Sequence, residues 1–97
     1  MSEKKTIVLD LTGCKYLDEL HERIRIAFDF PEWYGKNWDA FWDLMCTESD
    51  AEIVEVIGEY TLHEEFLPEL ELMHTVLSDL KIENAKYGWS FDYRIIS

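Results

Sequence analysis

The chain has 97 residues, of which 47% are hydrophobic and 14% aromatic, so we expect a single folded domain over residues 1–97 rather than a disordered acidic tail. It carries 21 acidic and 9 basic residues, which gives a formal net charge of -12. This charge repels nucleic acid and anionic membranes, so neither is an expected partner, and it attracts basic proteins.

A strand and a helix are predicted first. Residues 6–11 form a run rich in β-branched side chains that stops at Thr12-Gly13, as a strand does before a turn. Apolar residues then recur at helical spacing and predict a helix that ends before Pro31, because the residue preceding a proline avoids helical backbone angles. The residues of this stripe are Leu17, Leu20, His21, Ile24 and Phe28.

A loop and a second, short helix follow. Residues 31–36 are predicted as a loop because a proline and a glycine punctuate them, and Asn37 is a good N-cap for a helix over about 38–45. At about 100° per residue, the core-facing side of this helix is Trp38, Phe41, Leu44 and Met45. The opposite side is Asp39 and Asp43, with Trp42 on the border between the two faces.

The second half of the chain predicts a strand, a helical turn, a long helix and a last strand. Residues 53–58 are apolar enough to be buried on both faces of a sheet, and 60–65 predict a helical turn or short helix. Pro68 suits the first turn of the final helix, Gly88 suits its end, and 89–96 alternate as a strand. The apolar stripe of that helix is Leu70, Met73, His74, Leu77 and Leu80.

These elements predict an α/β fold. Strands that are separated by helices pair in parallel through right-handed crossovers, so the economical arrangement is a three-stranded parallel sheet packed by about four helices. Trp89 and Phe91 are expected in the core of this fold.

The acidic residues are concentrated in the middle of the chain. Residues 37–80 hold 12 acids and no Lys or Arg, whereas the rest has 9 acids and 9 bases. A field this one-sided favours encounter with a basic partner, although an acidic composition also serves solubility alone.

No catalytic set, metal site or cofactor motif is expected. Asp39 and Asp43 lie on one rigid helix face and cannot readily flank a substrate bond, as the carboxylates of a hydrolase do. The three histidines, His21, His63 and His74, are scattered singly, and His21 and His74 are expected in or at the border of the core. The chain is therefore not expected to be an enzyme.

The two cysteines and the N-terminus indicate a compartment. Cys14 and Cys46 have no CxxC spacing, and the start of the chain lacks the apolar segment of a signal peptide. No apolar run is long enough to cross a bilayer. We therefore expect a cytoplasmic protein with reduced thiols.

The stretch from Phe30 to Asp43 resembles the central motif of the barstar family, the intracellular inhibitors of a secreted bacterial ribonuclease. The family pattern there runs apolar-Pro-x-aromatic-Tyr-Gly-x-Asn-apolar-Asp-Ala-apolar-Trp-Asp, and this sequence matches it throughout. Asp18-Glu19-Leu20-His21 is similar to the first helix of the family. The resemblance implies a barstar-like, three-layer fold with a three-stranded parallel sheet.

The resemblance also implies a function: the loop and second helix plug the active site of a small, basic, extracellular, barnase-like ribonuclease in a one-to-one complex. The implied contact residues are Trp33, Tyr34, Gly35, Asn37, Asp39, Trp42 and Asp43. Glu83 on the last helix would add a further acid, and Asp79 a second one. The alternative is an acidic interaction module that uses the same surface on a basic partner which is not a ribonuclease. Within this motif, Trp33 replaces the smaller aromatic residue that is common in the family, and Lys36 introduces a positive charge.

Overall fold

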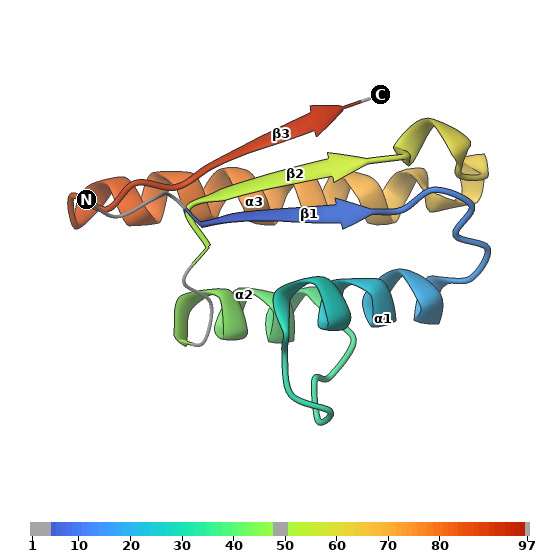
Figure 1. The fold of residues 1–97 in the computed structure, drawn as a ribbon, viewed down its shortest axis with the longest axis horizontal. Coiled ribbons are helices and arrows are strands. Elements are labelled where there is room, and N and C mark those ends of the chain that lie inside the picture. The colour runs from blue at the N-terminus through green and yellow to red at the C-terminus, as the bar shows by residue number, and fades with distance from the viewer. Residues whose placement is uncertain (1–4, 48–50, 97) are drawn as a thin grey trace.

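The computed structural model describes residues 5–47 and 51–96. Its elements in chain order are β1 (Thr6–Asp10), α1 (Leu17–Phe28), α2 (Trp38–Thr47), β2 (Ile53–Ile57), the 3-10 turns η1 (Glu59–Thr61) and η2 (Glu64–Phe66), α3 (Leu67–Lys86) and β3 (Asp92–Ile96). Figure 1 shows the three strands side by side with the helices below and behind them.

The sheet is parallel, as the sequence predicts. Its strand order is β1-β2-β3, and the register places Ile7 beside Val54 and Val54 beside Tyr93. Each crossover contains helix, because parallel neighbours cannot be joined by a tight turn. The prediction of a three-stranded parallel sheet is confirmed.

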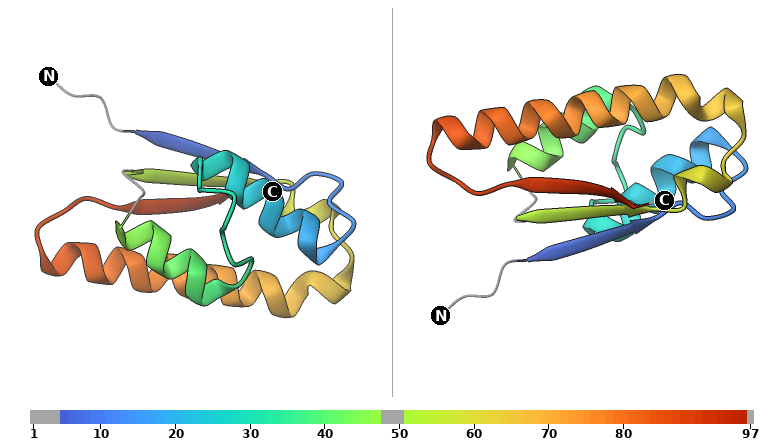
Figure 2. Two further views of the ribbon diagram at one scale, coloured as in Figure 1. Left: turned by 90° about the horizontal axis from the view of Figure 1, so that it is seen from below. Right: turned by 90° about the horizontal axis from the view of Figure 1, so that it is seen from above.

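All helices of the described residues lie on one face of this sheet (Figures 1 and 2). Strand burial alternates accordingly: Ile7 and Leu9 are buried, whereas Val8 between them is 50% exposed. When two crossover connections have the same handedness and lead in the same direction across a sheet, their helices lie on the same face of that sheet. The fold therefore has two layers where the resemblance implied three. The expectation that residues 53–58 are buried on both faces of the sheet is wrong, because Ile53, Glu55 and Ile57 on the outer face of β2 are only half-buried.

The helix count also differs from the predicted four. The described residues contain three α-helices, and the region predicted as a helical turn or short helix forms η1 and η2 instead. Gly58 before η1 has φ of 85°, and Pro68 lies in the first turn of α3. These two residues limit what lies between them to short, tight turns.

The apolar stripes of the long helices are confirmed apart from Leu17, which is 43% exposed at the start of α1. The buried residues of α1 are Leu20, His21, Ile24 and Phe28, and those of α3 are Leu70, Met73, Leu77 and Leu80. His74 lies at the edge of the core, where Nε2 contacts a Glu59 carboxylate oxygen at 2.7 Å. α1 ends at Phe28, and its C-cap Asp29 takes a left-handed φ of 56°, two residues before Pro31.

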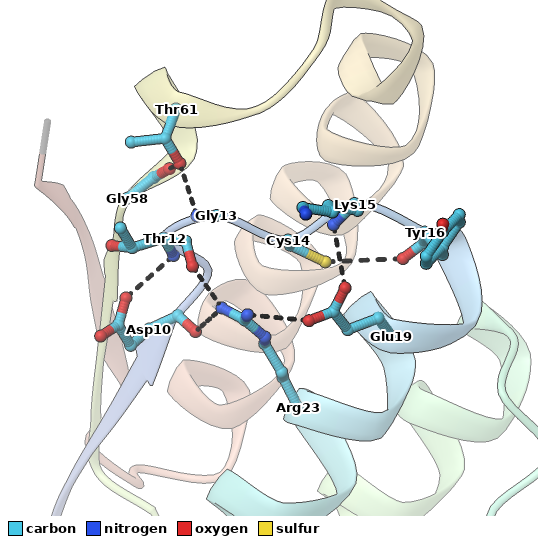
Figure 3. A network of polar contacts seen from close by, with 10 residues as sticks. All are labelled: Asp10, Thr12, Gly13, Cys14, Lys15, Tyr16, Glu19, Arg23, Gly58 and Thr61. Atoms are coloured by element: carbon cyan, nitrogen blue, oxygen red, sulfur yellow. Dashed lines mark hydrogen bonds and ion pairs between the residues drawn. The ribbon is translucent and has the colours of Figure 1, made fainter.

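The turn from β1 to α1 is held together by Arg23 (Figure 3). Its guanidinium donates to the backbone carbonyls of Asp10 and Thr12 at 3.1 and 2.8 Å, and it pairs with Glu19 at 2.9 Å. Glu19 also accepts the backbone N–H of Lys15. This network fixes α1 against the carboxyl end of β1.

Trp89 departs from its expected place in the core. It is 65% exposed, whereas Phe91 is buried as predicted. β3 begins only at Asp92, so the alternating pattern does not extend back to Trp89. Instead, Trp89 follows Gly88 at the end of α3, where the chain turns back toward the sheet.

Candidate functional site: an acidic helix and an aromatic loop

α2 is fixed to the rest of the molecule along one side. Phe41, Leu44 and Met45 are buried, as the helical phasing predicts. Trp38 is half-buried, and its indole Nε1 donates a 2.6 Å hydrogen bond to Glu69 in the first turn of α3. Figure 2 shows α2 lying alongside α3. The helix is therefore a rigid support for whatever its outer side carries.

Asn37 begins α2 in the way its sequence position predicts. Its side-chain Oδ1 accepts the backbone N–H of Ala40 at 2.8 Å, which satisfies one of the free donors at the start of the helix. Its Nδ2 donates to the backbone carbonyl of Gly35 at 3.1 Å. One side chain thus joins the loop to the helix and sets their relative position.

Tyr34 is placed differently from an exposed contact residue. It is buried, and its hydroxyl lies 2.8 Å from Nδ1 of His21 on α1. The hydroxyl also donates a longer bond, 3.4 Å, to the carbonyl of Asn37. Burial raises the pKa of Tyr34 and lowers that of His21, so the pair is neutral. The Tyr34 side chain therefore anchors the loop to α1.

The outer side of α2 carries the two predicted carboxylates. Asp39 and Asp43 are both exposed, and Trp42 is half-buried on the border, as predicted from the phasing. Ahead of the helix, Trp33 is 72% exposed and Gly35 is also exposed. The structure thus joins one large exposed indole and two carboxylates in a continuous segment, which we call the α2 face: Trp33, Gly35, Asn37, Asp39, Trp42 and Asp43.

Lys36 is the one cation within this segment. It takes a left-handed φ of 52°, and its Nζ lies 3.9 Å from a Glu22 carboxylate oxygen on α1. Glu22 in turn pairs with Arg25 at 2.6 Å. Lys36 therefore has an anionic neighbour on α1.

The predicted acids of α3 lie on the helix that runs beside α2. Glu83 is half-buried near Cys46: burial raises the pKa of the Cys46 thiol, and the charges of Asp43 and Glu83 raise it further. The carboxylates of Asp43 on α2 and Glu83 on α3 therefore both influence the Cys46 thiol. Asp79 is exposed on α3.

The structure also shows exposed aromatic residues near this surface that were not predicted as contact residues from the sequence. Tyr87 and Trp89 are both 65% exposed, and with Glu83 and Cys46 they line a pocket at the carboxyl end of α2. The sequence feature that could have indicated these residues is a glycine flanked by two aromatic residues at the end of a helix, Tyr87-Gly88-Trp89.

Other kinds of site are not assembled within the described residues. There, no three His, Cys, Asp or Glu side chains come together as metal ligands, and no helix has the length and apolarity to cross a membrane. Cys14 is buried and Cys46 exposed, and both are free thiols.

Comparison with known proteins identifies similar sequences. The model of the family described as "Barstar (barnase inhibitor)" matches residues 4–95, which include the whole α2 face. The Bacillus subtilis (strain 168) protein called "Putative ribonuclease inhibitor YrdF" is 27% identical over 84 residues, covering 81% of this chain and 92% of the relative.

Proposed function

The chain belongs to the barstar family, and we propose that it inhibits a small, basic, barnase-like ribonuclease by closing the active site in a one-to-one complex. In this proposal α2 enters the site with Asp39 and Asp43, and the loop carrying Trp33 covers the rim. The observation that carries the proposal is the exposure of both aspartates on one side of a helix whose other side is buried.

The chemistry of the target supports this assignment. A ribonuclease must hold a phosphodiester, so its active site presents Arg, Lys or His. Carboxylates form short, charge-assisted hydrogen bonds with the same groups and can occupy the positions of phosphate oxygens. Asp39 and Asp43 are four residues apart on a helix, so they offer two such anions at a fixed separation.

The rigidity of α2 supports tight binding. Its cap, its buried side and the bond from Trp38 to Glu69 hold the aspartates in place before any partner arrives. Association then loses little conformational entropy at this surface. The acidic field of residues 37–80 also accelerates encounter with a basic enzyme.

A second contact is proposed for α3. Glu83 lies close enough to Cys46 to act on the same thiol as Asp43, so it extends the acidic surface beyond α2. Asp79 is exposed on the same helix and is proposed as a further acidic contact.

We place this activity in the cytoplasm, with the whole chain acting as one domain. A cell that makes a ribonuclease for export must block any enzyme that stays inside, and an acidic protein with free thiols suits that compartment. The role is that of an immunity protein, with no reaction catalysed by the chain itself.

The test is inhibition of RNA cleavage. The purified chain is mixed with small basic ribonucleases from the organism that makes it, and cleavage of a fluorogenic RNA is followed as the inhibitor approaches equimolar amounts. We expect cleavage to stop near one equivalent. Full cleavage by every such enzyme at a large excess of inhibitor would refute the proposal.

Matched variants locate the surface. Asp43→Ala should weaken inhibition far more than Glu64→Ala, because Glu64 is an exposed acid of the same acidic span that lies in η2, outside the α2 face. Equal effects would argue against α2 as the anchor. If a basic protein that is not a ribonuclease is captured only while Asp39 and Asp43 are intact, the interaction-module alternative holds instead.

A further inference from the structure

A pocket of about 320 Å³ lies where the carboxyl ends of α2 and α3 meet. Its lining residues are Met45, Cys46, Glu83, Asn84, Tyr87 and Trp89. Because Cys46 lies within the influence of both Asp43 and Glu83, the pocket continues the α2 face onto the end of α3. We call it the α2–α3 pocket.

Its outer wall is aromatic and exposed. The rings of Tyr87 and Trp89 have centroids 5.6 Å apart with a 36° angle between their planes, and each side chain is 65% exposed. Large aromatic side chains that line a cavity and face solvent are enriched at the centres of protein interfaces. The pocket therefore offers an aromatic surface that no part of the described chain covers.

The position of this wall is fixed by the backbone. Gly88 takes a left-handed φ of 75°, and the N–H of Trp89 donates to the carbonyl of Asn84 at 3.0 Å. The N–H of Gly88 donates to Ala85 at 3.1 Å, which completes a Schellman motif at the end of α3. Trp89 is thus held at the helix end, so a ligand would not have to order its backbone.

The electrostatics of the pocket favour a cation. Glu83 lines it, Asp43 lies nearby, and the last turn of α2 contains no basic residue to offset the negative end of the helix dipole. Lys86 is 3.5 Å from Glu83 but is 65% exposed, so it neutralises that carboxylate only weakly. An aromatic face beside a carboxylate is the environment that binds a planar guanidinium, by stacking and by ion pairing.

We propose that the α2–α3 pocket receives an arginine side chain of the partner, stacked on Trp89 and paired with Glu83. This inference rests on the proposed function, because it names a second contact for the same ribonuclease. Tyr87 and Trp89 would then extend the inhibitory surface beyond the α2 face.

The first experiment needs no ribonuclease. N-acetylarginine amide is titrated into the ¹⁵N-labelled chain, with N-acetylcitrulline amide as a neutral probe of the same shape, and the tryptophan indole N–H signals are followed by NMR. The Trp89 signal is identified as the one lost in Trp89→Phe. We expect the arginine probe to move the Trp89 signal more than those of Trp33, Trp38 and Trp42. Equal shifts with both probes, or none at Trp89, would overturn the proposal.

Two variants are expected to change the affinity for the arginine probe in opposite directions. Trp89→Ala should weaken binding of the arginine probe by about threefold to tenfold, since it removes the stacking surface. Lys86→Gln should tighten it, because it removes the competing cation from Glu83. Tyr60→Ala is the matched control: Tyr60 is 75% exposed but lies in η1, outside the pocket. If it weakened binding as much as Trp89→Ala does, the pocket assignment would be wrong.

The second experiment uses any ribonuclease that the wild-type chain inhibits. Trp89→Ala should dissociate faster from it by a similar factor, and Tyr60→Ala should not. Unchanged dissociation of Trp89→Ala would remove the pocket from the interface while leaving the inhibitor assignment intact. If no ribonuclease is inhibited, the proposed function fails, and the arginine titration alone decides whether the pocket binds a guanidinium.

Discussion

Nδ1 of His21 on α1 lies 2.8 Å from the hydroxyl of Tyr34, and both side chains are buried. The ring centroids of His21 and Tyr34 are 5.8 Å apart, and the centroid of the His21 ring is 4.6 Å from that of Trp38, the first residue of α2. One histidine therefore connects the first helix to both the loop and the helix of the candidate surface. The stability of α1 and the placement of the loop are coupled through this contact.

Tyr34→Phe tests that coupling. The change keeps the ring but removes the hydroxyl, so it leaves the buried Nδ1 of His21 without its partner, and we expect the free energy of unfolding to fall by about 1–3 kcal/mol. Urea unfolding followed by circular dichroism measures this loss. The exposed Trp33 is the control, since Trp33→Phe should change stability by less than about 0.5 kcal/mol. Similar losses in both variants would show that the hydroxyl contributes little.

The same histidine predicts a pH dependence. Burial lowers the pKa of His21 below 6.5, Glu69 and Asp18 oppose this in part, and Lys36 adds to it. In the unfolded chain His21 binds a proton near pH 6.5, whereas in the folded chain its lowered pKa resists protonation. The contribution of neutral His21 to the free energy of unfolding is therefore complete above pH 6.5 and is lost as the pH falls toward the lowered folded pKa.

The measurement compares how the free energy of unfolding changes with pH in two proteins. Urea unfolding of the wild type and of His21→Gln is recorded between pH 8 and pH 5, so that the difference between the two pH profiles isolates the contribution of His21. The wild type should lose stability relative to the variant below pH 6.5, by up to about 1.4 kcal/mol for each unit of pKa difference. Parallel pH profiles would contradict the prediction.

Local signals in the sequence were enough to predict α2 and the side it exposes. The cap at Asn37, the buried Phe41 and the exposed Asp39 and Asp43 all follow from residue type and helical spacing. The parallel sheet follows from strands separated by helices. The features of α2 depend on neighbours within a few residues, which a sequence displays directly, and the sheet depends only on the order of strands and helices along the chain.

Features set by distant contacts were not predicted. Tyr34 is buried because His21, 13 residues earlier, lies where its hydroxyl can reach, and no local pattern contains that fact. β2 is apolar whether one face or both are covered, and the sequential strand order decides between them. Trp89 has the phase of a core strand residue, but the Gly88 turn places it outside the sheet.

The cap of α2 gives a third prediction. Asn37→Ala removes the acceptor for the Ala40 N–H and the donor to Gly35, and should cost about 1 kcal/mol of stability. Asn37→Asp keeps the acceptor and adds a charge that the start of a helix favours, so it should restore most of this loss. Thermal unfolding of the three proteins measures the order. An Asp variant as unstable as the Ala variant would assign the effect to the bond with Gly35.

Two glycines with similar backbone angles provide the last prediction. Gly58 has φ of 85° and Gly88 has φ of 75°, so both lie in the left-handed region that other residues enter at a cost. Their surroundings differ. A Cβ at Gly58 would lie 2.4 Å from the backbone nitrogen of Thr12, whereas a Cβ at Gly88 would meet nothing within 4 Å.

Gly58→Ala should therefore destabilise the chain far more than Gly88→Ala. The Gly88 variant carries only the conformational cost, about 1 kcal/mol. The Gly58 variant must also push β2 away from the turn after β1, which Arg23 holds through the carbonyls of Asp10 and Thr12, so its loss should exceed about 3 kcal/mol. Urea unfolding of the two variants side by side makes the comparison, and equal losses would mean that the close approach of Gly58 to Thr12 relaxes without cost.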